Sequence, residues 1–442
     1  MTLPGVLYSK QLLSDEFLSI ASFAHQDIEK LKKGESETTF FRIEAMEETK
    51  QLSRATLNDR IERSKTFFDG LEYRSRLPQG MHDRGEAYAF ANHPLDNPRD
   101  IGGHIGHLPI YVRMISIPEK IVKRNEVWDI SVYAPEWGVN DRIEMYSLVN
   151  IGRLILEENA AVVVHGNALG FTCGEIVKES FSNREYDIGI LATWHGFGRR
   201  QGSFNGADGS NGPNGKDGEA GVKPQLAANF LGHELPDIFN PVAMNGTCGG
   251  DGSSGQNGED GLVGGACRIA EINIRAYKGI FPLIIGVIAG DGGNGGNAGN
   301  GGDGGNGGDG VKCFKTFDGG IHYGKAGKGG KAGEGGNGGR AGHGGMSSHV
   351  FIDVPYECAR NIYFFSLPGK TGVPGAGGRG GSPGKAGVQG DGSADINCAS
   401  AGMEGRRGRE GKVMPAAKIY LNNHPYQYEE STNCNGELLR EK

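Results

Sequence analysis

The sequence has little proline and no long apolar run, and each absence argues against one class of protein. It has 18 prolines against 78 glycines in 442 residues, whereas collagen needs abundant proline beside its glycine. No apolar stretch reaches the ~18 residues that a membrane span requires. The longest one, around Ile280 to Ala289, is interrupted by Gly286 and predicts a buried strand. The composition therefore argues against a collagen rod and predicts no membrane span.

Paired cysteine motifs and a secretory leader are also missing. The seven cysteines are scattered, and no two form a CxxC pair that would indicate a zinc ribbon or a thioredoxin-like site. The N-terminus lacks the basic flank and apolar core of a signal peptide. The odd cysteine count favours free thiols in the cytoplasm, while disulfides at the ends of the glycine runs stay open if the protein is exported or assembled without a Sec signal. A net charge of −7 predicts no general attraction to nucleic acid.

Residues 1–100 are expected to form a helical N-terminal region. Ser14 can cap a helix whose apolar residues recur at steps of three and four as far as Leu31. A second helical pattern runs from Ile43 to Phe68. Together the two patterns predict an N-terminal α-helical hairpin, which either mediates self-association or packs on its own chain.

Residues 101–200 change to a period of two and predict a β domain. The expected strands are Ile110–Ile117, Val127–Tyr133, Arg153–Glu157 and a segment from Ala160 that ends in Gly166-Asn167. This strand, turn, strand rhythm resembles a coil of a right-handed β-solenoid, and a small antiparallel sandwich is the rival. The expectation for the centre is a β-sandwich or a short β-solenoid.

Residues 201–442 carry glycine at every third position in six runs. Numbered in chain order, the runs are Gly206–Gly221, Gly246–Gly264, Gly290–Gly308, Gly324–Gly345, Gly369–Gly390 and Gly402–Gly411. A strict period of three suits neither an α-helix nor a strand, but it suits a polyproline-II helix with three residues per turn. A strand, turn, strand segment separates runs 2 and 3 and again runs 4 and 5. The prediction for this half is a bundle of polyglycine/polyproline-II helices connected by β-hairpins.

Glycine would let neighbouring backbones approach until their amides bond to one another, because a polyproline-II helix makes no internal hydrogen bonds. Each glycine costs ~0.5–1 kcal/mol of backbone entropy relative to alanine, so dozens of them need a structural reason. At ~3.1 Å per residue runs 3 and 4 would each be ~65 Å long. The glycines assigned this structural role are Gly290, Gly293, Gly296, Gly299, Gly302, Gly305, Gly308, Gly327, Gly330, Gly333, Gly336, Gly339 and Gly342.

The residues between the glycines carry the charge. In run 3 the second position is Asp or Asn from Asp291 to Asp309, and this row is interpreted as a solvated polar face in preference to a cation site. Runs 1 to 3 have a charge balance of −8 and runs 4 to 6 a balance of +7. Either the two groups pair between copies of the chain, giving head-to-tail assembly, or they neutralise each other within one molecule.

The sequence contains no P-loop or zinc-protease motif, so no catalytic residue and no cofactor is assigned and the chain is not expected to be an enzyme. His104 and His107 are spaced so that both could bind one metal ion, but no acidic or cysteine partner completes the set, and loop histidines are the favoured interpretation. The segment from Trp194 to Arg200 is either a ligand patch or a plug at the junction with run 1.

The Gly-x-x phase in several short runs resembles the polyglycine-II bundle proteins, such as the snow flea antifreeze proteins and the glycine-rich receptor-binding adhesins at phage tail tips. The resemblance covers residues 202–412. The chain departs from those families in its N-terminal region and in the long strand pairs between its runs.

The leading functional hypothesis is a non-enzymatic structural, self-assembling scaffold or an interaction protein, with self-association and a protein or glycan partner. One alternative is a carbohydrate- or receptor-binding adhesin that uses the tips of the bundle, where Phe281, Tyr363, Phe364 and Phe365 are expected. Another is an ice-binding protein, against which the charged rows argue because an ice face requires small, weakly hydrated side chains.

Overall fold

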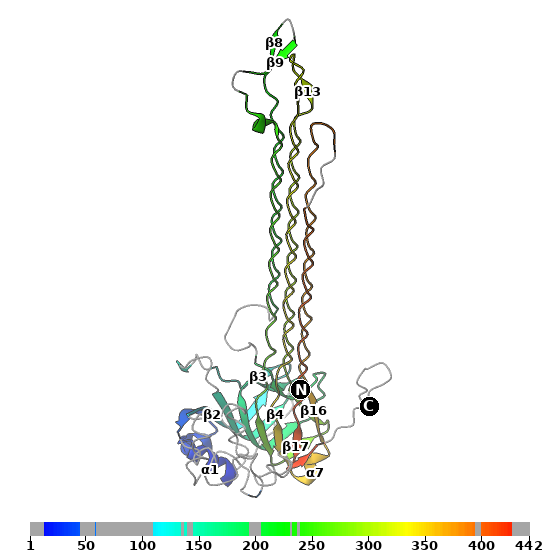
Figure 1. Ribbon diagram of the computed structural model, residues 1–442. Helices are drawn as coiled ribbons and strands as arrows, with labels where there is room; N and C mark the ends of the chain where they lie inside the picture. Colours follow the sequence, from blue (N-terminus) through cyan, green and yellow to red (C-terminus); the bar gives the residue numbers. More distant parts are fainter. Residues whose placement is uncertain are drawn as a thin grey trace, which may run out of the picture.

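The chain divides into a base of sheets and short helices and a long, narrow projection made by the glycine runs (Figure 1). The structure is a computed structural model, and it describes residues 13–44, 58, 109–133, 137–138, 145–193, 205–229, 232–236, 239–393 and 399–426. In the projection, the six runs are extended segments without helix or strand that lie side by side.

Two β-sheets form the base. The larger has nine strands: β1 (Glu37–Ile43), β2 (Ile110–Val122), β4 (Met145–Leu156), β6 (Ala168–Lys178), β10 (Ala270–Ile274), β15 (Val350–Asp353), β17 (Ile419–Leu421) and β18 (His424–Pro425) in spatial order, with β11 (Tyr277–Gly279) paired to β6. The smaller has five: β16 (Ile362–Leu367), β12 (Leu283–Ile288), β7 (Ile188–Leu191), β5 (Ala161–His165) and β3 (Val127–Asp129). Short pairs form between β8 (Ala227–Asn229) and β9 (Gly232–Glu234), and between β13 (Phe314–Lys315) and β14 (Ile321–His322).

The chain winds between the two sheets in successive coils. Strands β2, β4, β6, β10 and β15 lie in the large sheet, and each is followed in the chain by a strand of the small sheet, β3, β5, β7, β12 and β16 respectively. Neighbouring strands from different coils pair in parallel, with Ile272 level with Phe171 on one side and Ile352 on the other. Among the described strands of these two sheets, only β1 and β18, at the two edges of the large sheet, pair antiparallel. Each coil thus repeats the previous one at the next position along both sheets.

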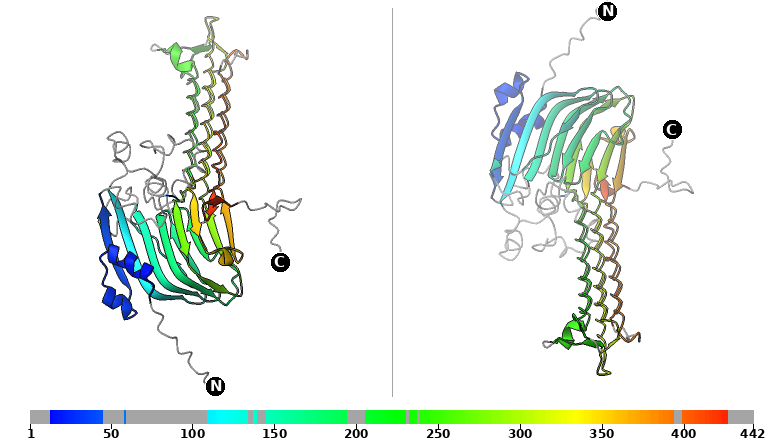
Figure 2. Two further views of the ribbon diagram at one scale, coloured as in Figure 1. Left: turned by 90° about the horizontal axis from the view of Figure 1, so that it is seen from below. Right: turned by 90° about the horizontal axis from the view of Figure 1, so that it is seen from above.

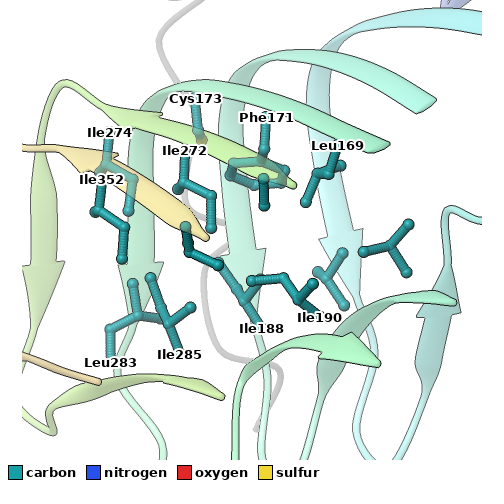
Figure 3. Packing of buried hydrophobic residues seen from close by; sticks show 14 of the residues in the cluster. Leu169, Phe171, Cys173, Ile188, Ile190, Ile272, Ile274, Leu283, Ile285 and Ile352 are labelled. Atoms are coloured by element: carbon teal, nitrogen blue, oxygen red, sulfur yellow. The ribbon is translucent and has the colours of Figure 1, made fainter. Parts of the chain in front are cut away.

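The main core lies between the two sheets (Figure 3). Phe171 and Ile272 of the large sheet and Leu283 and Ile285 of the small sheet are completely buried. Strands buried on both faces carry continuous apolar, β-branched sequences, which is typical of parallel sheets. This explains why the segment beginning at Leu283 has the longest apolar run of the chain.

Helices cover the outer face of the large sheet near its N-terminal edge. Helix α1 (Asp15–Phe23) begins at Ser14, whose side chain accepts a hydrogen bond from Phe17 N–H, so the expected cap is confirmed. The short α2 (Ile28–Lys32) follows. Two further short helices are α7 (Tyr356–Ala359) and a 3₁₀ turn, η3 (Pro241–Met244). Asn150 of β4 donates to Phe17 O at 2.9 Å, which ties α1 to the sheet.

A buried ion pair holds the turn between β6 and β7. Lys178 Nζ lies 2.6 Å from Asp187 Oδ2 and 2.8 Å from Pro282 O, while Asp187 also accepts from Ile284 N–H at 2.8 Å. Burial raises the pKa of Asp187, although the lysine and the amide oppose the shift. Because both charges have hydrogen-bonded partners, the pair links the third coil to the fourth without leaving an uncompensated buried charge.

All three pairs of glycine runs leave the base at the same kind of junction. Runs 1 and 2 lie between β7 and β10, runs 3 and 4 between β12 and β15, and runs 5 and 6 between β16 and β17, so each pair lengthens the return from the small sheet to the large one. In the second coil the same return is only Gly166 and Asn167. Gly166 has a φ of 63°, and a Cβ there would overlap Thr193. The projection therefore rises from one side of the later coils, away from α1 (Figure 2).

The predicted fold class is wrong. The regular secondary structure is mainly a large mixed sheet and a smaller parallel sheet, with few helices, and not a bundle of polyglycine helices. The strand pairs between runs are not β-hairpins, because β10 and β12 join different sheets, as do β15 and β16. Each of these strands finds its hydrogen-bonding partner in another coil, and a turn long enough to cross between sheets separates it from its neighbour in the chain.

The expected N-terminal helical hairpin is not seen among the described residues either. Phe41 and Ile43 lie in β1, where alternate side chains face the sheet interior, so a period of two prevails over the helical pattern proposed there. The rest of that second pattern, up to Phe68, lies outside the described residues apart from Glu44 and Asn58. The two sheets also run past residue 200, since β10, β15 and β17 extend the sheet that β2, β4 and β6 begin.

Candidate functional site

The six runs of the projection are joined by backbone hydrogen bonds that cross from run to run. Run 3 is the most enclosed: Gly292 N–H donates to Lys370 O of run 5, and Gly293 N–H donates to Leu262 O of run 2, both at 2.8 Å. Gly293 O accepts from Gly342 N–H of run 4, also at 2.8 Å. The pattern recurs every three residues, so each row of amides faces one neighbouring run. Bonds between runs thus satisfy amides that have no partner within their own run.

These bonds arrange the runs in two layers. Runs 1, 3 and 5 are parallel neighbours and form the odd layer, and runs 2, 4 and 6 form the even layer. Representative bonds within the layers are Gly206 N–H to Asn294 O, Gly292 N–H to Lys370 O, Gly246 N–H to Lys325 O and Gly335 N–H to Met403 O. Antiparallel contacts, such as Gly250 N–H to Lys216 O at 2.7 Å, join the layers. The result is a slab two runs thick and three runs wide.

Backbone crowding explains the glycines to which the sequence assigned a structural role. A Cβ at Gly302 would lie 2.1 Å from Pro213 O, and one at Gly336 would lie 2.1 Å from Gln256 O. Comparable backbone contacts, from 1.8 to 2.6 Å, would occur at Gly290, Gly296, Gly299, Gly305, Gly308, Gly327, Gly330, Gly333, Gly339 and Gly342. No flexible side chain is available to move aside. Each glycine therefore fills a place where another run passes too close for a methyl group.

The Asp and Asn residues of run 3 are more than a solvated face. Asp291 Oδ1 accepts a hydrogen bond from Lys370 N–H at 2.8 Å, and Asn300 Oδ1 accepts one from Arg379 N–H at 2.9 Å. The same bond occurs at Asn294, Asn297, Asp303, Asn306 and Asp309. A short side chain with a terminal oxygen is what reaches the neighbouring amide. Every such residue in run 3 thus binds run 5 through its side chain.

We call the residues at this place in each triplet the ladder positions. They are every third residue from Asn205 to Asp217, from Asn245 to Asp260, from Asp291 to Asp309, from Lys325 to His343, from Lys370 to Val388 and from Met403 to Lys412. Run 1 accepts from run 3 at Asn205, Asp208, Asn211, Asn214 and Asp217, and run 2 accepts from run 4 at Asn245, Asp251, Asn257 and Asp260.

Ladder positions in the last run of the odd layer differ. Run 5 has no Asp or Asn there, and carries Lys370, Val373, Ala376, Arg379, Ser382, Lys385 and Val388. In the part of the chain that the structure describes, no further run lies beyond run 5 to donate an amide. Sequence reasoning missed this bond, and the confinement of Asp and Asn to runs with a parallel neighbour further along the chain is the signal that could have revealed it.

The exposed face of the even layer carries a row of positive charge, which we call the basic strip. It consists of Lys325, Lys328, Lys331, Arg340, Arg406, Arg409 and Lys412, all exposed and all at ladder positions of runs 4 and 6. Glu334 is the one carboxylate at a ladder position of these two runs. Within the described part of the chain, only Arg340 of this set comes within ion-pair distance of a carboxylate, at 3.9 Å from Asp260.

The far end of the projection is built from the turns between runs. His322 lies between two rings, with centroid distances of 5.6 Å to Phe314 and 5.9 Å to Phe239, and Lys223 sits over Phe314. Phe317 N–H donates to His233 O at 3.1 Å, which ties the first turn to the second. Figure 1 shows β8, β9 and β13 at this end, far from the base.

The aromatic residues expected at the tip are in the base instead. Tyr363 and Phe364 belong to β16, where Phe364 is buried and Tyr363 is half exposed. Phe281 lies in the turn before β12 and packs edge-on against Phe181, with centroids 5.8 Å apart. Their alternating pattern belongs to a strand of the sheet stack, so they give no support to binding at the tip.

The histidine candidates cannot be placed. His104 and His107, and the segment from Trp194 to Arg200, lie outside the described residues. In the described ranges no group of three or more His, Cys, Asp or Glu side chains is arranged to hold a metal ion. No helix in those ranges is both long and apolar enough to cross a membrane.

Five of the cysteines are described, and all five are free thiols. Cys173 and Cys267 are buried in the base, and burial raises the pKa of both, to about 12 for Cys267. Cys248 and Cys313 are exposed in or beside the runs. The sequence left open a disulfide at the ends of the glycine runs, and neither Cys248 nor Cys313 forms one.

Comparison with known proteins gives no relative for this chain: no family model, no curated protein and no solved structure matches it.

Proposed function

We propose that the chain is a non-enzymatic structural or interaction protein, in which the base holds the slab of glycine runs as a stiff projecting element. The supporting observation is the double attachment between parallel runs. Each triplet of run 3 is held to run 5 by a backbone bond, such as Gly292 N–H to Lys370 O, and by a side-chain bond, such as Lys370 N–H to Asp291 Oδ1. Two bonds per triplet over the whole length resist sliding and splaying of the runs.

The way the slab is anchored supports the same function. All three pairs of runs begin and end in strands of the base, so six chain crossings fix one end of the projection. The turns at the other end contact one another, as in the bond from Phe317 to His233. Such an element keeps its far end at a constant distance from the base and presents flat faces along its length.

Self-association is part of the proposal. The basic strip lies on the even layer, and carboxylates such as Asp208, Asp217 and Asp303 occupy ladder positions of the odd layer. The two layers face opposite sides of one slab, so runs 4 and 6 of one copy can stack on runs 1 and 3 of the next with opposite charges in contact. Exposed charge pairs are individually weak and are screened by salt.

Imaging and sedimentation of the purified chain test this function together. Negative-stain images should show a globular base with a thin, straight projection. The sedimenting mass should exceed that of one chain at low ionic strength and fall towards it at high ionic strength. A flexible or collapsed outline would contradict the stiff element, and a mass that does not change with salt would contradict charge-driven association.

An adhesin that binds a glycan or a receptor is the second candidate, favoured by the cluster at the far end. His322, Phe314, Phe239 and Lys223 combine aromatic faces with polar groups in the turns at the far end of the projection. Glycan-array binding by the whole chain, compared with a variant in which Phe314 and Phe239 are alanine, tests it. Equal binding by both forms would exclude the cluster as the binding site.

A further inference from the structure

The hydrogen bonds between the runs do not require the positive charges of the basic strip. The slab's own bonding favours an acceptor side chain at a ladder position that faces a parallel neighbour, and run 3 has one at all seven such positions. In run 4, Asn337 and His343 do the same work, accepting from Arg406 N–H and Lys412 N–H at 2.9 and 2.8 Å.

Arg340 lies between these two acceptors in run 4 and cannot accept a hydrogen bond. It stands next to Arg409, whose carbonyl receives the bond from Ala341 N–H at 2.9 Å. Two exposed guanidinium groups at neighbouring ladder positions repel each other, and the amide of Arg409 gains no side-chain acceptor from run 4. An Asn at position 340 would supply the bond and remove the repulsion. The exposed pair of Arg340 with Asp260, at 3.9 Å, contributes little against these two effects. The chain therefore gives up stability here for positive charge.

We propose that the basic strip is a binding site for a linear acidic polysaccharide, that is, a sugar polymer bearing carboxylate or sulfate groups. Lys and Arg side chains form charge-assisted hydrogen bonds with such groups. The inference deepens the interaction role proposed above, and it does not require self-association, although a second copy of the chain would compete for the same face.

The spacing of the strip favours a polyanion with sparse charge. Three residues at ~3.1 Å each put successive ladder side chains of one run ~9 Å apart. Nucleic-acid phosphates follow one another every ~3.4 Å along the axis of each strand, which is much denser. Proteins that bind single strands also stack bases on aromatic side chains, and no Phe, Tyr or Trp occupies a ladder position of run 4 or run 6. A polymer with one charge per sugar or disaccharide suits these rows better.

The test measures binding of the full chain to hyaluronate, polygalacturonate, neutral dextran and a single-stranded DNA, at a protein concentration where sedimentation shows one species. One variant replaces Lys325, Lys328 and Lys331 with serine. Its matched control replaces Lys370, Arg379 and Lys385 with serine, removing three basic residues from ladder positions on the odd layer. The wild type should bind hyaluronate or polygalacturonate more tightly than DNA and should not bind dextran. The strip variant should lose about tenfold in affinity and the control less than about twofold, since each exposed pair contributes little.

A single substitution, Arg340→Asn, separates binding from folding. It should weaken binding to the acidic polysaccharide while leaving the midpoint of thermal unfolding unchanged or higher, because an acceptor replaces a repelling charge. The proposal is overturned if the strip variant and its control lose affinity equally, if DNA binds more tightly than either polysaccharide, if none of the probes binds, or if Arg340→Asn lowers the unfolding midpoint and leaves binding intact. Failure of these binding tests would leave the images and the salt-dependent mass, and with them the proposed scaffold, unaffected.

Discussion

The base and the projection of this chain are held together by different forces. In the base, large apolar side chains such as Phe171 and Ile272 are removed from water between two sheets. In the projection, the atoms buried in run 3 are those of glycine and the backbone, and the contacts are amide hydrogen bonds to other runs. Burial of apolar area tolerates some change of shape, whereas the runs depend on an approach so close that a single methyl group disrupts it. The comparison shows that one chain can use a conventional core and an almost side-chain-free interior.

The largest effect is expected from removing an apolar side chain from the base. Phe171→Ala should lower the free energy of unfolding of the base by about 3–5 kcal/mol, because the ring is fully buried and the cavity cannot close completely. Tyr363→Ala on the exposed side of β16 is the control and should cost much less. Denaturant unfolding measures both. Similar losses for the two variants would mean that the sheets do not pack as described.

A smaller but more local effect is expected from a methyl group in the projection. Gly302→Ala should cost about 1–3 kcal/mol by overpacking, because its Cβ would lie 2.1 Å from Pro213 O. Gly250→Ala is the matched control: its nearest contact would be Lys216 N at 3.1 Å, and other residues at its place in run 2 carry side chains. Amide hydrogen exchange should speed up around run 3 in the first variant alone. Faster exchange in the base instead would contradict the division between the two parts.

Removing a side chain from a ladder position should cost less stability than adding a methyl group to a glycine of the runs. Asn300→Ala removes the acceptor for Arg379 N–H and should cost about 1 kcal/mol. Asn300→Asp keeps an oxygen in place and should recover most of the loss. Val388→Ala, at a ladder position of run 5 whose side chain accepts no hydrogen bond, should have little effect. Thermal unfolding compares the three, and an equal response from Asn300→Ala and Val388→Ala would show that the side-chain bond contributes no stability.

Thiol labelling distinguishes the base from the projection, and it should have the smallest effect on the stability of either. In a chain with Cys358, Cys398 and Cys434 replaced by serine, native protein should react at Cys248 and Cys313, which are exposed. Cys173 and Cys267 should react only on unfolding, because burial raises the pKa of each thiol and blocks the reagent. Mass spectrometry of the labelled chain reads out both classes, and prompt labelling of Cys173 would contradict its place in the core.

Local patterns in the sequence located much of the structure. The cap at Ser14, and strands that overlap β2, β3, β4, β5, β10, β12, β15 and β16, follow from periodicity and turn chemistry. The glycine phase marked out the projection. The pairing of the strands could not be predicted from the sequence. The alternation of side chains in β10 and β12 is the same whether these strands pair with each other or with strands from other coils. Which strands pair depends on contacts between residues far apart in the sequence, and the pattern within one segment carries no information about them.

The ladder could not be predicted for a related reason. An Asp or Asn row looks the same whether its oxygens face water or an amide of the next run. Only the order of the runs in space distinguishes the two, and that order follows from where each pair of runs leaves the sheets. The predicted position of the aromatic residues was wrong for the same reason. The sequence predicts Phe364 at the tip of the bundle, whereas in the structure it lies in the base and packs against Tyr426.

Run 5 also sets the width of the slab. Its prolines, Pro374 and Pro383, occupy the triplet place at which Gly295 and Gly304 of run 3 donate to run 5, so two of the amides that could recruit another strand of this kind do not exist. Its ladder side chains offer almost no oxygen to an incoming amide. A fourth pair of runs placed at this margin would therefore meet fewer amide donors and almost no side-chain acceptors, so run 5 forms the lateral edge of the slab.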